Sequence, residues 1–309
     1  MQAFHFDAQP LILPPGHRFP HHKYAALRER LERALPQLRL QAAPRAALPA
    51  LRAVHTEAYV QRVLDGSLSA AEQREIGFPW NPGMPVRALH SVGATLAATR
   101  AALLEGVAMN LGGGTHHASA DCGGGYCVFN DVAVAARWAQ QQRGVRQVLV
   151  IDLDVHQGNG TASIFAGDPT VFTLSLHGAK NFPFRKVAGD LDVDLPDACG
   201  DDAYLQALDQ ALAALDTRLR EAPGLVFYLA GADPHAGDRL GRLGLSTAAM
   251  AARDARVFDW LRAHPAAVVM LMAGGYPTDL EALLDVQQAS AVAAWRLWAE
   301  WNNAGLPVD

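Results

Sequence analysis

The run Val148-Leu-Val-Ile-Asp-Leu-Asp-Val-His156 indicates a buried strand that ends in polar residues at every second position. Its apolar start is typical of a parallel strand covered by helices on both faces. Because side chains alternate along a strand, we expect Asp152, Asp154 and His156 to point roughly the same way. Burying neighbouring carboxylates without compensation is unfavourable, so the pattern favours a bound cation.

Carboxylate oxygen and imidazole nitrogen are both zinc ligands, and this run alone would serve either zinc or manganese. The alternative is that its polar residues only cap the Gly158-Asn-Gly160 turn that follows. The cost of burying two carboxylates makes a metal site the favoured interpretation.

Short apolar runs alternate with longer helical patterns from about Val107 onward, as is typical of βα units that form a parallel sheet. The predicted strands are Val107–Leu111, Gln147–Asp154, Thr170–Leu176, Leu225–Ala230 and Ala267–Ala273. The predicted helices are Val86 to about Glu105, Asp131 to Gly144, Asp201 or Asp202 to about Glu221, and Ser246 to about His264. The pattern predicts an α/β fold with a mostly parallel central sheet flanked by helices. The first part of the chain is less regular, and the stretch from Leu176 to Gly200 shows no periodic pattern.

Length and composition favour one soluble catalytic domain over residues 1–309. Half of the 309 residues are apolar, and the net charge of −5 with no basic cluster argues against nucleic-acid binding. The three cysteines, Cys122, Cys127 and Cys199, match neither a zinc finger nor a disulfide framework, so a reducing cytoplasm is expected. We find no signal peptide and no apolar run long enough to span a membrane.

Two other predicted strands also run into chemically useful residues. Leu225–Ala230 leads into Gly231-Ala-Asp233, and Ala267–Ala273 leads into Gly274-Gly-Tyr276. Because the carboxyl ends of parallel strands meet at one edge of the sheet, we expect the active site there. Asp233 is a candidate third metal ligand; its alternative role is that of a turn or helix-capping aspartate.

The segment Leu111-Gly-Gly-Gly-Thr-His-His-Ala118 also follows a predicted strand. Its glycines allow close approach of the backbone, so His116 and His117 can be presented into a cavity. A phosphate-binding loop is disfavoured because no lysine follows at the required spacing. The remaining alternative is a pair of ordinary surface or core histidines. The nearby Gly123-Gly-Gly-Tyr-Cys127 run can equally be a flexible turn before a helix cap.

Together these motifs resemble those of the histone deacetylase family, which has the arginase–deacetylase fold. The shared motifs, in the family's order, are Gly114-Thr-His-His-Ala118, Gly124-Gly-Tyr-Cys-Val-Phe-Asn130, Asp152-Leu-Asp-Val-His-Gln-Gly-Asn-Gly-Thr161, Gly231-Ala-Asp233 and Gly274-Gly-Tyr276. The resemblance covers roughly Phe4 to Ala291. Asn159 and the early His17-Arg-Phe-Pro20 segment are closest to the class IV type and its bacterial relatives.

The resemblance implies a role for each matching residue. Asp154, His156 and Asp233 would bind one Zn²⁺, His117 would be the general base with His116 as its partner, Asp152 would orient His116, and Tyr276 would donate its hydroxyl to the substrate carbonyl. Gly125 and Tyr126 would line a tunnel for the acyl-lysine stem. Phe182 or Phe184 would form the opposite wall, although ordinary loop packing is an equal alternative for both. A structural K⁺ or Na⁺ would lie near the carbonyls of Asp152 to His156 and Ser175-Leu176.

Asn159 departs from those family members that have an aspartate near this position. A neutral amide stabilises an imidazolium less than a carboxylate does, so the sequence predicts a less basic His117. Many relatives carry asparagine here, so activity is still expected.

The resemblance therefore implies a zinc-dependent deacylase that acts on an acyl-lysine peptide or a small acyl-amine. Small-molecule deacetylation, for example of acetylpolyamines, is an alternative, as is an acyl-lysine-binding module with weak catalysis. The complete metal-and-base set argues against a binding module. An arginase-like enzyme with two manganese ions would need further ligands for a second metal.

Overall fold

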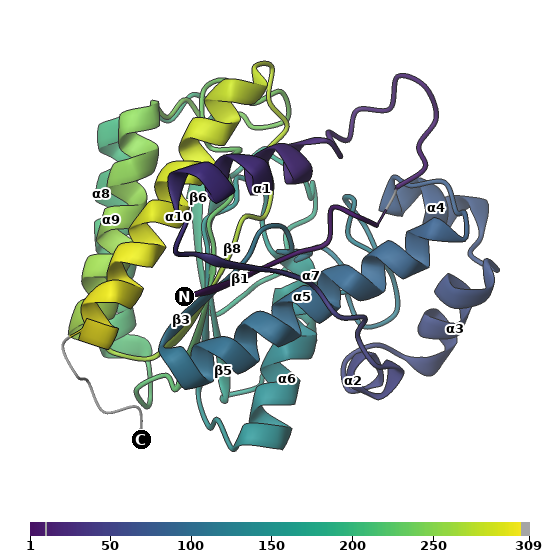
Figure 1. Cartoon of the computed structure of the whole chain (residues 1–309), viewed down its shortest axis with the longest axis horizontal. Helices are drawn as coiled ribbons and strands as arrows, with labels where there is room; N and C mark the ends of the chain where they lie inside the picture. The colour runs from purple at the N-terminus through teal and green to yellow at the C-terminus, as the bar shows by residue number, and fades with distance from the viewer. Residues whose placement is uncertain (10, 304–309) are drawn as a thin grey trace.

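The computed structural model describes residues 1–9 and 11–303. Residue 10, and residues 304–309 at the end of the single domain expected over 1–309, lie outside the described residues. The described strands are β1 (Gln2–His5), β2 (Arg39–Ala42), β3 (Val107–Asn110), β4 (Val148–Asp152), β5 (Val171–Gly178), β6 (Leu191–Leu195), β7 (Leu225–Leu229) and β8 (Ala267–Leu271). They form one sheet in the order β2-β1-β3-β8-β7-β4-β5-β6 (Figure 1).

Every strand pair in this sheet is parallel, which confirms the predicted α/β fold with a parallel central sheet. All the strands therefore present their carboxyl ends at one edge. The adjacent strands β3, β8, β7 and β4 lead directly into the glycine-rich and acidic motifs. This strand order brings segments more than 100 residues apart in sequence to one place.

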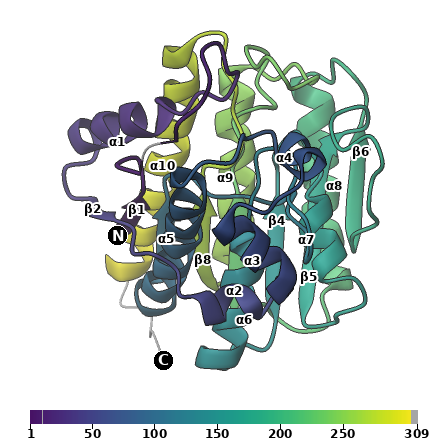
Figure 2. The ribbon, with the colours of Figure 1, turned by 90° about the vertical axis from the view of Figure 1, so that its right-hand side faces the viewer.

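Helices cover both faces of the sheet (Figures 1 and 2). The described helices are α1 (Lys23–Ala34), α2 (Leu48–Arg52), α3 (Glu57–Asp65), α4 (Ala70–Ile76), α5 (Gly83–Glu105), α6 (Asp131–Arg143), α7 (Asn159–Ile164), α8 (Asp201–Arg218), α9 (Thr247–Ala263) and α10 (Leu280–Asn303). One core lies between the sheet and α1, α8, α9 and α10, and the other lies on the side of α5 and α6. Along β4, Leu149 and Ile151 join the first core and Val148 and Val150 the second, as alternation in a strand requires.

The predicted helix boundaries follow from local capping. The Asn130 side chain accepts a hydrogen bond from the backbone N–H of Ala133 at the start of α6, and Gly144 ends that helix with φ of 69°. Ser246 caps α9 in the same way, through the N–H of Ala249. These caps place both helices within a residue or two of the sequence-based expectation.

Three strands were missed by the sequence analysis. β1 and β2 lie in the segment that was described as irregular, and β6 lies in the stretch from Leu176 to Gly200, which was expected to lack regular structure. These strands are four or five residues long and only partly buried in β2 and β6, so their sequences lack a continuous apolar run. No helix within the described residues is long and apolar enough to cross a membrane.

Candidate active site

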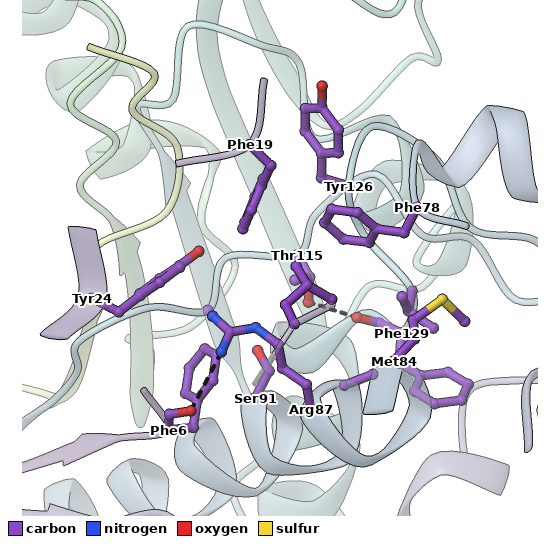
Figure 3. Close-up of a pocket in the computed structure, with 14 residues that line it drawn as sticks. Phe6, Phe19, Tyr24, Phe78, Met84, Arg87, Ser91, Thr115, Tyr126 and Phe129 are labelled. Carbon is purple, nitrogen blue, oxygen red and sulfur yellow. Dashed lines mark hydrogen bonds between the residues drawn. The ribbon is translucent and has the colours of Figure 1, made fainter. Parts of the chain in front are cut away.

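Two adjoining cavities open at the carboxyl edge of the sheet. The first is lined by the predicted site residues His116, His117, Asp154, His156 and Tyr276. The second, shown in Figure 3, is largely aromatic and shares Phe19, Tyr24 and Tyr126 with the first. The structure thus gathers motifs from the ends of β3, β4 and β8 around one space, and Asp233 after β7 lies beside the Asp154 and His156 that line it.

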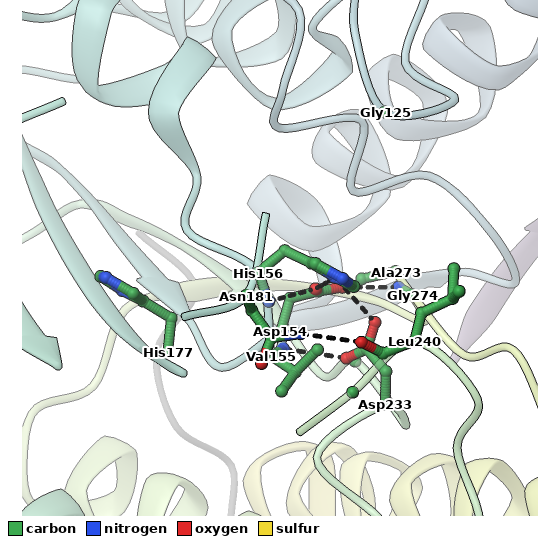
Figure 4. Close-up of polar contacts among 12 residues, drawn as sticks. Gly125, Asp154, Val155, His156, His177, Asn181, Asp233, Leu240, Ala273 and Gly274 are labelled. Atoms are coloured by element: carbon green, nitrogen blue, oxygen red, sulfur yellow. Dashed lines mark hydrogen bonds and ion pairs between the residues drawn. The ribbon is translucent and has the colours of Figure 1, made fainter. Parts of the chain in front are cut away.

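Asp154, His156 and Asp233 offer three ligand atoms that lie within 4.8 Å of one another (Figure 4). Asp154 and His156 come from the turn after β4, and Asp233 comes from the turn after β7. The backbone N–H of Val155 donates to Asp233 Oδ1 at 2.9 Å, and that of Gly274 donates to Asp154 Oδ2 at 2.8 Å. Together with the contact of His156 Nδ1 to Asp154 Oδ1 at 3.0 Å, these backbone contacts hold the carboxylates in place.

The donor set of this triad fits a divalent cation. Asp154 and Asp233 are almost fully buried, and Asp233 Oδ2 has no hydrogen-bond partner among the described residues. Burial and the neighbouring Asp154 carboxylate raise the pKa of Asp233 to about 7. Carboxylate oxygen and imidazole nitrogen are both zinc ligands, and three protein ligands leave a fourth position open, as in catalytic zinc sites.

Gly274 and Gly231 allow the backbone to pass directly beside the two carboxylates. A Cβ on Gly274 would lie 1.9 Å from Asp233 Oδ2 and 2.4 Å from Asp154 Oδ2. A Cβ on Gly231 would lie 2.8 Å from Asp154 Oδ2. Any larger residue at either position would therefore push into the space between the ligands.

Asp152 lies on the same side of the chain as Asp154 and His156, as expected, but it does not join the triad. β4 ends at Asp152, two residues before the predicted end of the strand, yet Leu153 and Val155 join the same core as Leu149 and Ile151, so the alternation continues into the turn. Asp152 Oδ2 instead accepts a hydrogen bond from His116 Nδ1 at 2.6 Å. The turn places this carboxylate on the histidine side of the cavity.

The two histidines sit in opposite electrostatic environments. Burial alone would lower the pKa of His116, but the charges of Asp152 and Asp154 outweigh it and raise the pKa to about 9. Burial lowers the pKa of His117 well below its usual value, and the neighbouring His116 and His156 charges add to this effect. His117 Nδ1 donates to Asn159 Oδ1 at 2.7 Å, which leaves its Nε2 as the unprotonated nitrogen. Opposite pKa shifts of two neighbouring titratable groups are typical of a catalytic acid and base.

Asp131 organises the loop that carries these histidines. Its carboxylate accepts hydrogen bonds from the backbone N–H of Gly114 at 3.1 Å and of Thr115 at 2.8 Å. The hydroxyls of Thr95 and Thr115 donate to it as well. The sequence analysis assigned Asp131 only to the start of a helix, because its loop partners come from elsewhere in the chain.

Tyr276 lies at the wall of the same cavity. Its ring centroid is 6.4 Å from that of His156 and 5.7 Å from that of Tyr126. Burial, with the charges of Asp154 and Asp233, raises the pKa of its hydroxyl well above the usual value, so the hydroxyl remains a hydrogen-bond donor.

Lys23 is a buried residue of this site that sequence reasoning missed. It is 2% exposed, and its Nζ donates to the carbonyl of Gly275 at 3.0 Å. The same ammonium lies 5.5 Å from the centre of the Tyr276 ring. Lys23 therefore ties the first turn of α1 to the turn that carries Tyr276.

Arg253 and Asp254 form a buried ion pair that the sequence analysis did not predict. Both are fully buried in α9, where Arg253 Nε donates to Asp254 Oδ1 at 2.8 Å. Arg253 Nη1 also donates to the carbonyl of Gly231 at 2.5 Å. This ion pair thus connects α9 to the turn that leads to Asp233.

The predicted tunnel residues divide into two groups. Phe182 packs edge-on against His117 with centroids 4.8 Å apart, and a Cβ on Gly125 would lie 3.0 Å from the Phe182 ring. Tyr126 follows Gly125 with a positive φ of 67° and lines the cavity. Phe184 is 86% exposed and touches Phe182 from outside. Of the two phenylalanines, Phe182 is the one that the structure brings to the site.

The histone deacetylase domain model matches residues 17–290. The chain belongs to the histone deacetylase family. It is 41% identical to an uncharacterised protein of Picosynechococcus over 88% of this chain and 91% of that protein. It is 33% identical to a histone deacetylase-like amidohydrolase of Pseudomonas aeruginosa, over 78% of this chain and 67% of the relative. With histone deacetylase 2 of Arabidopsis thaliana it shares 34% identity, and it spans 60% of that protein.

Solved structures of this deacetylase family support the fold. The crystal structure of an HDAC homologue complexed with SAHA matches with a TM-score of 0.78 at 24% identity, covering 97% of this chain and 88% of the other. A homologue from Aquifex aeolicus gives the same TM-score at 23% identity, covering 99% and 84%. The family resemblance and the arginase–deacetylase fold expected from the motifs are thereby confirmed, and the family indicates a deacetylase or amidohydrolase.

Proposed function

We propose that this deacetylase-family chain is a zinc-dependent deacylase that hydrolyses the amide of acyl-lysine, or of a related acyl-amine, to a free amine and a carboxylate. The observation that carries the proposal is the Asp154-His156-Asp233 triad beside two histidines of opposite basicity. Two of the metal ligands, a base and a hydroxyl donor then line one cavity, and the third ligand, Asp233, lies within 4.8 Å of the other two.

Asp154, His156 and Asp233 would hold the zinc ion. When bound, zinc supplies Lewis-acid activation of the amide carbonyl and of the attacking water. The site provides two carboxylates and an imidazole, and Asp233 Oδ2 makes no hydrogen bond within the described residues, with His156 Nδ1 3.4 Å away.

The histidines would move the protons. His117 lines the cavity, and its contact with Asn159 leaves Nε2 unprotonated. This nitrogen would take the proton of the attacking water. His116, kept protonated by Asp152 and Asp154, stabilises charge beside it and can supply a proton for the leaving amine. Tyr276 would donate its hydroxyl to the carbonyl oxygen as negative charge develops there.

Gly125, Tyr126 and Phe182 would line the path of the acyl-lysine stem. Aromatic walls suit a linear aliphatic chain because they exclude water without requiring hydrogen bonds. Phe184, exposed at the rim, would contact the substrate only outside the cavity. A small acyl-amine such as an acetylpolyamine fits the same path and is the second candidate substrate. A pure binding module is disfavoured because the ligand and base set is complete.

A structural K⁺ or Na⁺ near Asp152 to His156 stays a prediction. Asp152 pairs with Ser175 across β4 and β5, so the two segments expected to supply carbonyl ligands are neighbours.

Turnover of fluorogenic acyl-lysine peptides, with and without a zinc chelator, tests the proposal. We expect release of the amine that stops on chelation and returns when zinc is added back. Manganese addition to the metal-free protein is the control for the choice of metal. Zinc binding without turnover of any peptide would exclude acyl-lysine deacylation and favour small-molecule amides.

Exchange of Asn159 for aspartate is expected to make His117 more basic. A carboxylate 2.7 Å from His117 Nδ1 favours the imidazolium, so the acid limb of the pH–rate profile, which reports deprotonation of the base, should move to higher pH. The measurement is kcat/KM against pH for wild type and Asn159→Asp. An unchanged or lowered apparent pKa in the variant would contradict the assignment of His117 as the base.

A further inference from the structure

The aromatic cavity in Figure 3 adjoins the catalytic cavity on the side of α5. Its free volume is about 60 Å³, and since a cavity needs roughly 10–15 Å³ of this volume to hold one water, it has room for a carboxylate-sized group. Phe19, Tyr24 and Tyr126 line both cavities, so a group that extends beyond the catalytic cavity would enter this one. The proposed deacylation leaves this space without a role.

Arg87 of α5 is the charged residue that lines this cavity. It is only 8% exposed. Its Nη1 donates to the carbonyl of Gln9 at 2.8 Å, whereas Nη2 has no hydrogen-bond partner among the described residues. Figure 3 shows the guanidinium pointing into the space between Phe6 and Tyr24. Nη2 is therefore a buried donor that no group within the described residues uses.

The positive charge of Arg87 lacks a counter-ion within the described part of the chain, where no carboxylate lies within 4.0 Å of its nitrogens. The Asp7 carboxylate, whose charge acts on Arg87, is already bound by Arg28 at 3.0 Å and by His5. The Phe6 and Tyr24 rings, 4.9 and 4.8 Å away, compensate the guanidinium only in part. A buried charge without a partner is costly, so an anion at this point would be stabilising.

Ser91 lies one turn further along α5 and faces the same cavity. Residues four apart on a helix share a face, so the Ser91 hydroxyl and the Arg87 guanidinium converge there. An arginine fork recognises a planar carboxylate through two parallel hydrogen bonds, which a neutral acyl chain cannot accept. An acetyl group has no atom that would use this arrangement.

We propose that this cavity receives the far end of the acyl group and that Arg87 binds a terminal carboxylate there, so that succinyl and glutaryl amides are preferred substrates. The inference rests on the proposed deacylase function. Its chemistry is the same hydrolysis: water adds across the amide, the C–N bond breaks, the amine takes a proton, and a dicarboxylate is released. Arg87 acts on specificity and takes no part in proton transfer.

The test compares kcat/KM for succinyl-, glutaryl-, butyryl- and acetyl-lysine peptides in wild type and in Arg87→Met. We expect wild type to favour glutaryl or succinyl over butyryl by about tenfold or more, as a hydrogen bond to a charged group predicts. The ratio should fall to about one in Arg87→Met. Ser91→Ala, a milder change, should lower it in part. Because each ratio is taken within one protein sample, it does not depend on the folded fraction.

Arg100→Met is the matched control, since Arg100 lies on the same helix, is exposed and is not among the residues that line the cavity. It should retain both the wild-type rates and the wild-type ratio. Equal rates for charged and neutral acyl groups in wild type would overturn the inference. So would an equal loss for all peptides in Arg87→Met, which indicates a purely structural arginine.

Equilibrium binding of the same peptides to chelator-treated protein separates this inference from the proposed reaction. If the chelator-treated protein binds glutaryl-lysine with an Arg87-dependent preference while the zinc-loaded protein turns over no peptide, carboxylate binding in the cavity is supported and the deacylase function is refuted. Turnover of acetyl-lysine without such a binding preference would support the deacylase function and refute carboxylate binding in the cavity. Inhibition by free acetate that Arg87→Met removes, with no acyl preference, would assign the cavity to a free carboxylate and overturn the proposal.

Discussion

Replacement of Tyr276 by phenylalanine is expected to lower kcat by about 10²–10³-fold, the effect of removing one donor to a developing oxyanion. Phenylalanine keeps the ring that packs against Tyr126 and Lys23 and loses only the hydroxyl. Ground-state binding of an acyl-lysine peptide should therefore change little. The measurement is kcat from steady-state turnover together with Kd from fluorescence anisotropy.

Tyr126→Phe is the control for Tyr276→Phe, because it removes a hydroxyl from the same cavity without removing the proposed donor. Its effect on kcat should be much smaller. A similar loss in both variants, or weakened binding with kcat retained, would show that Tyr276 shapes the cavity rather than stabilising charge.

Replacement of Gly274 by alanine is expected to abolish tight zinc binding. The new methyl carbon would lie 1.9 Å from Asp233 Oδ2 and 2.4 Å from Asp154 Oδ2, so the carboxylates or the turn must move. Displacing groups that orient metal ligands typically costs about 10–100-fold in affinity, and here the ligands themselves are displaced. Competition with a chromophoric chelator measures the zinc affinity directly.

Gly200→Ala provides a matched glycine substitution. A Cβ there would meet nothing within 4 Å, and φ is −93°, a value that alanine adopts readily. Its zinc affinity and thermal unfolding should match those of wild type. Zinc affinity retained in Gly274→Ala would place the metal away from Asp154 and Asp233.

Local sequence was a good guide where a strand is buried on both faces. The run that begins at Val148 is apolar because β4 lies in the middle of the sheet, and the same holds for β7 and β8. β6 was missed because its residues, Leu191–Leu195, alternate between apolar and acidic at the exposed edge of the sheet. The sequence pattern of such an edge strand resembles that of a solvated loop.

The strand-end motifs alone predicted the metal triad, the two histidines and Tyr276, because parallel strands necessarily bring their carboxyl ends together. Alternation alone did not distinguish Asp152 from the metal ligands; in the structure its carboxylate accepts a hydrogen bond from His116, the partner that the family resemblance implied. The choice of Phe182 over Phe184 likewise came from exposure, which no local pattern encodes.

The sequence by itself therefore determined the fold class and the residues that meet at the carboxyl edge of the sheet, because these depend on patterns within single segments. Only the tertiary structure decided the roles of Lys23, Arg87 and Arg253. Lys23 contacts Gly275 across 252 positions of sequence, and Arg87 contacts Gln9 across 78. Buried cations of this kind are specified by what packs around them, and such long-range contacts leave no periodic trace in the chain.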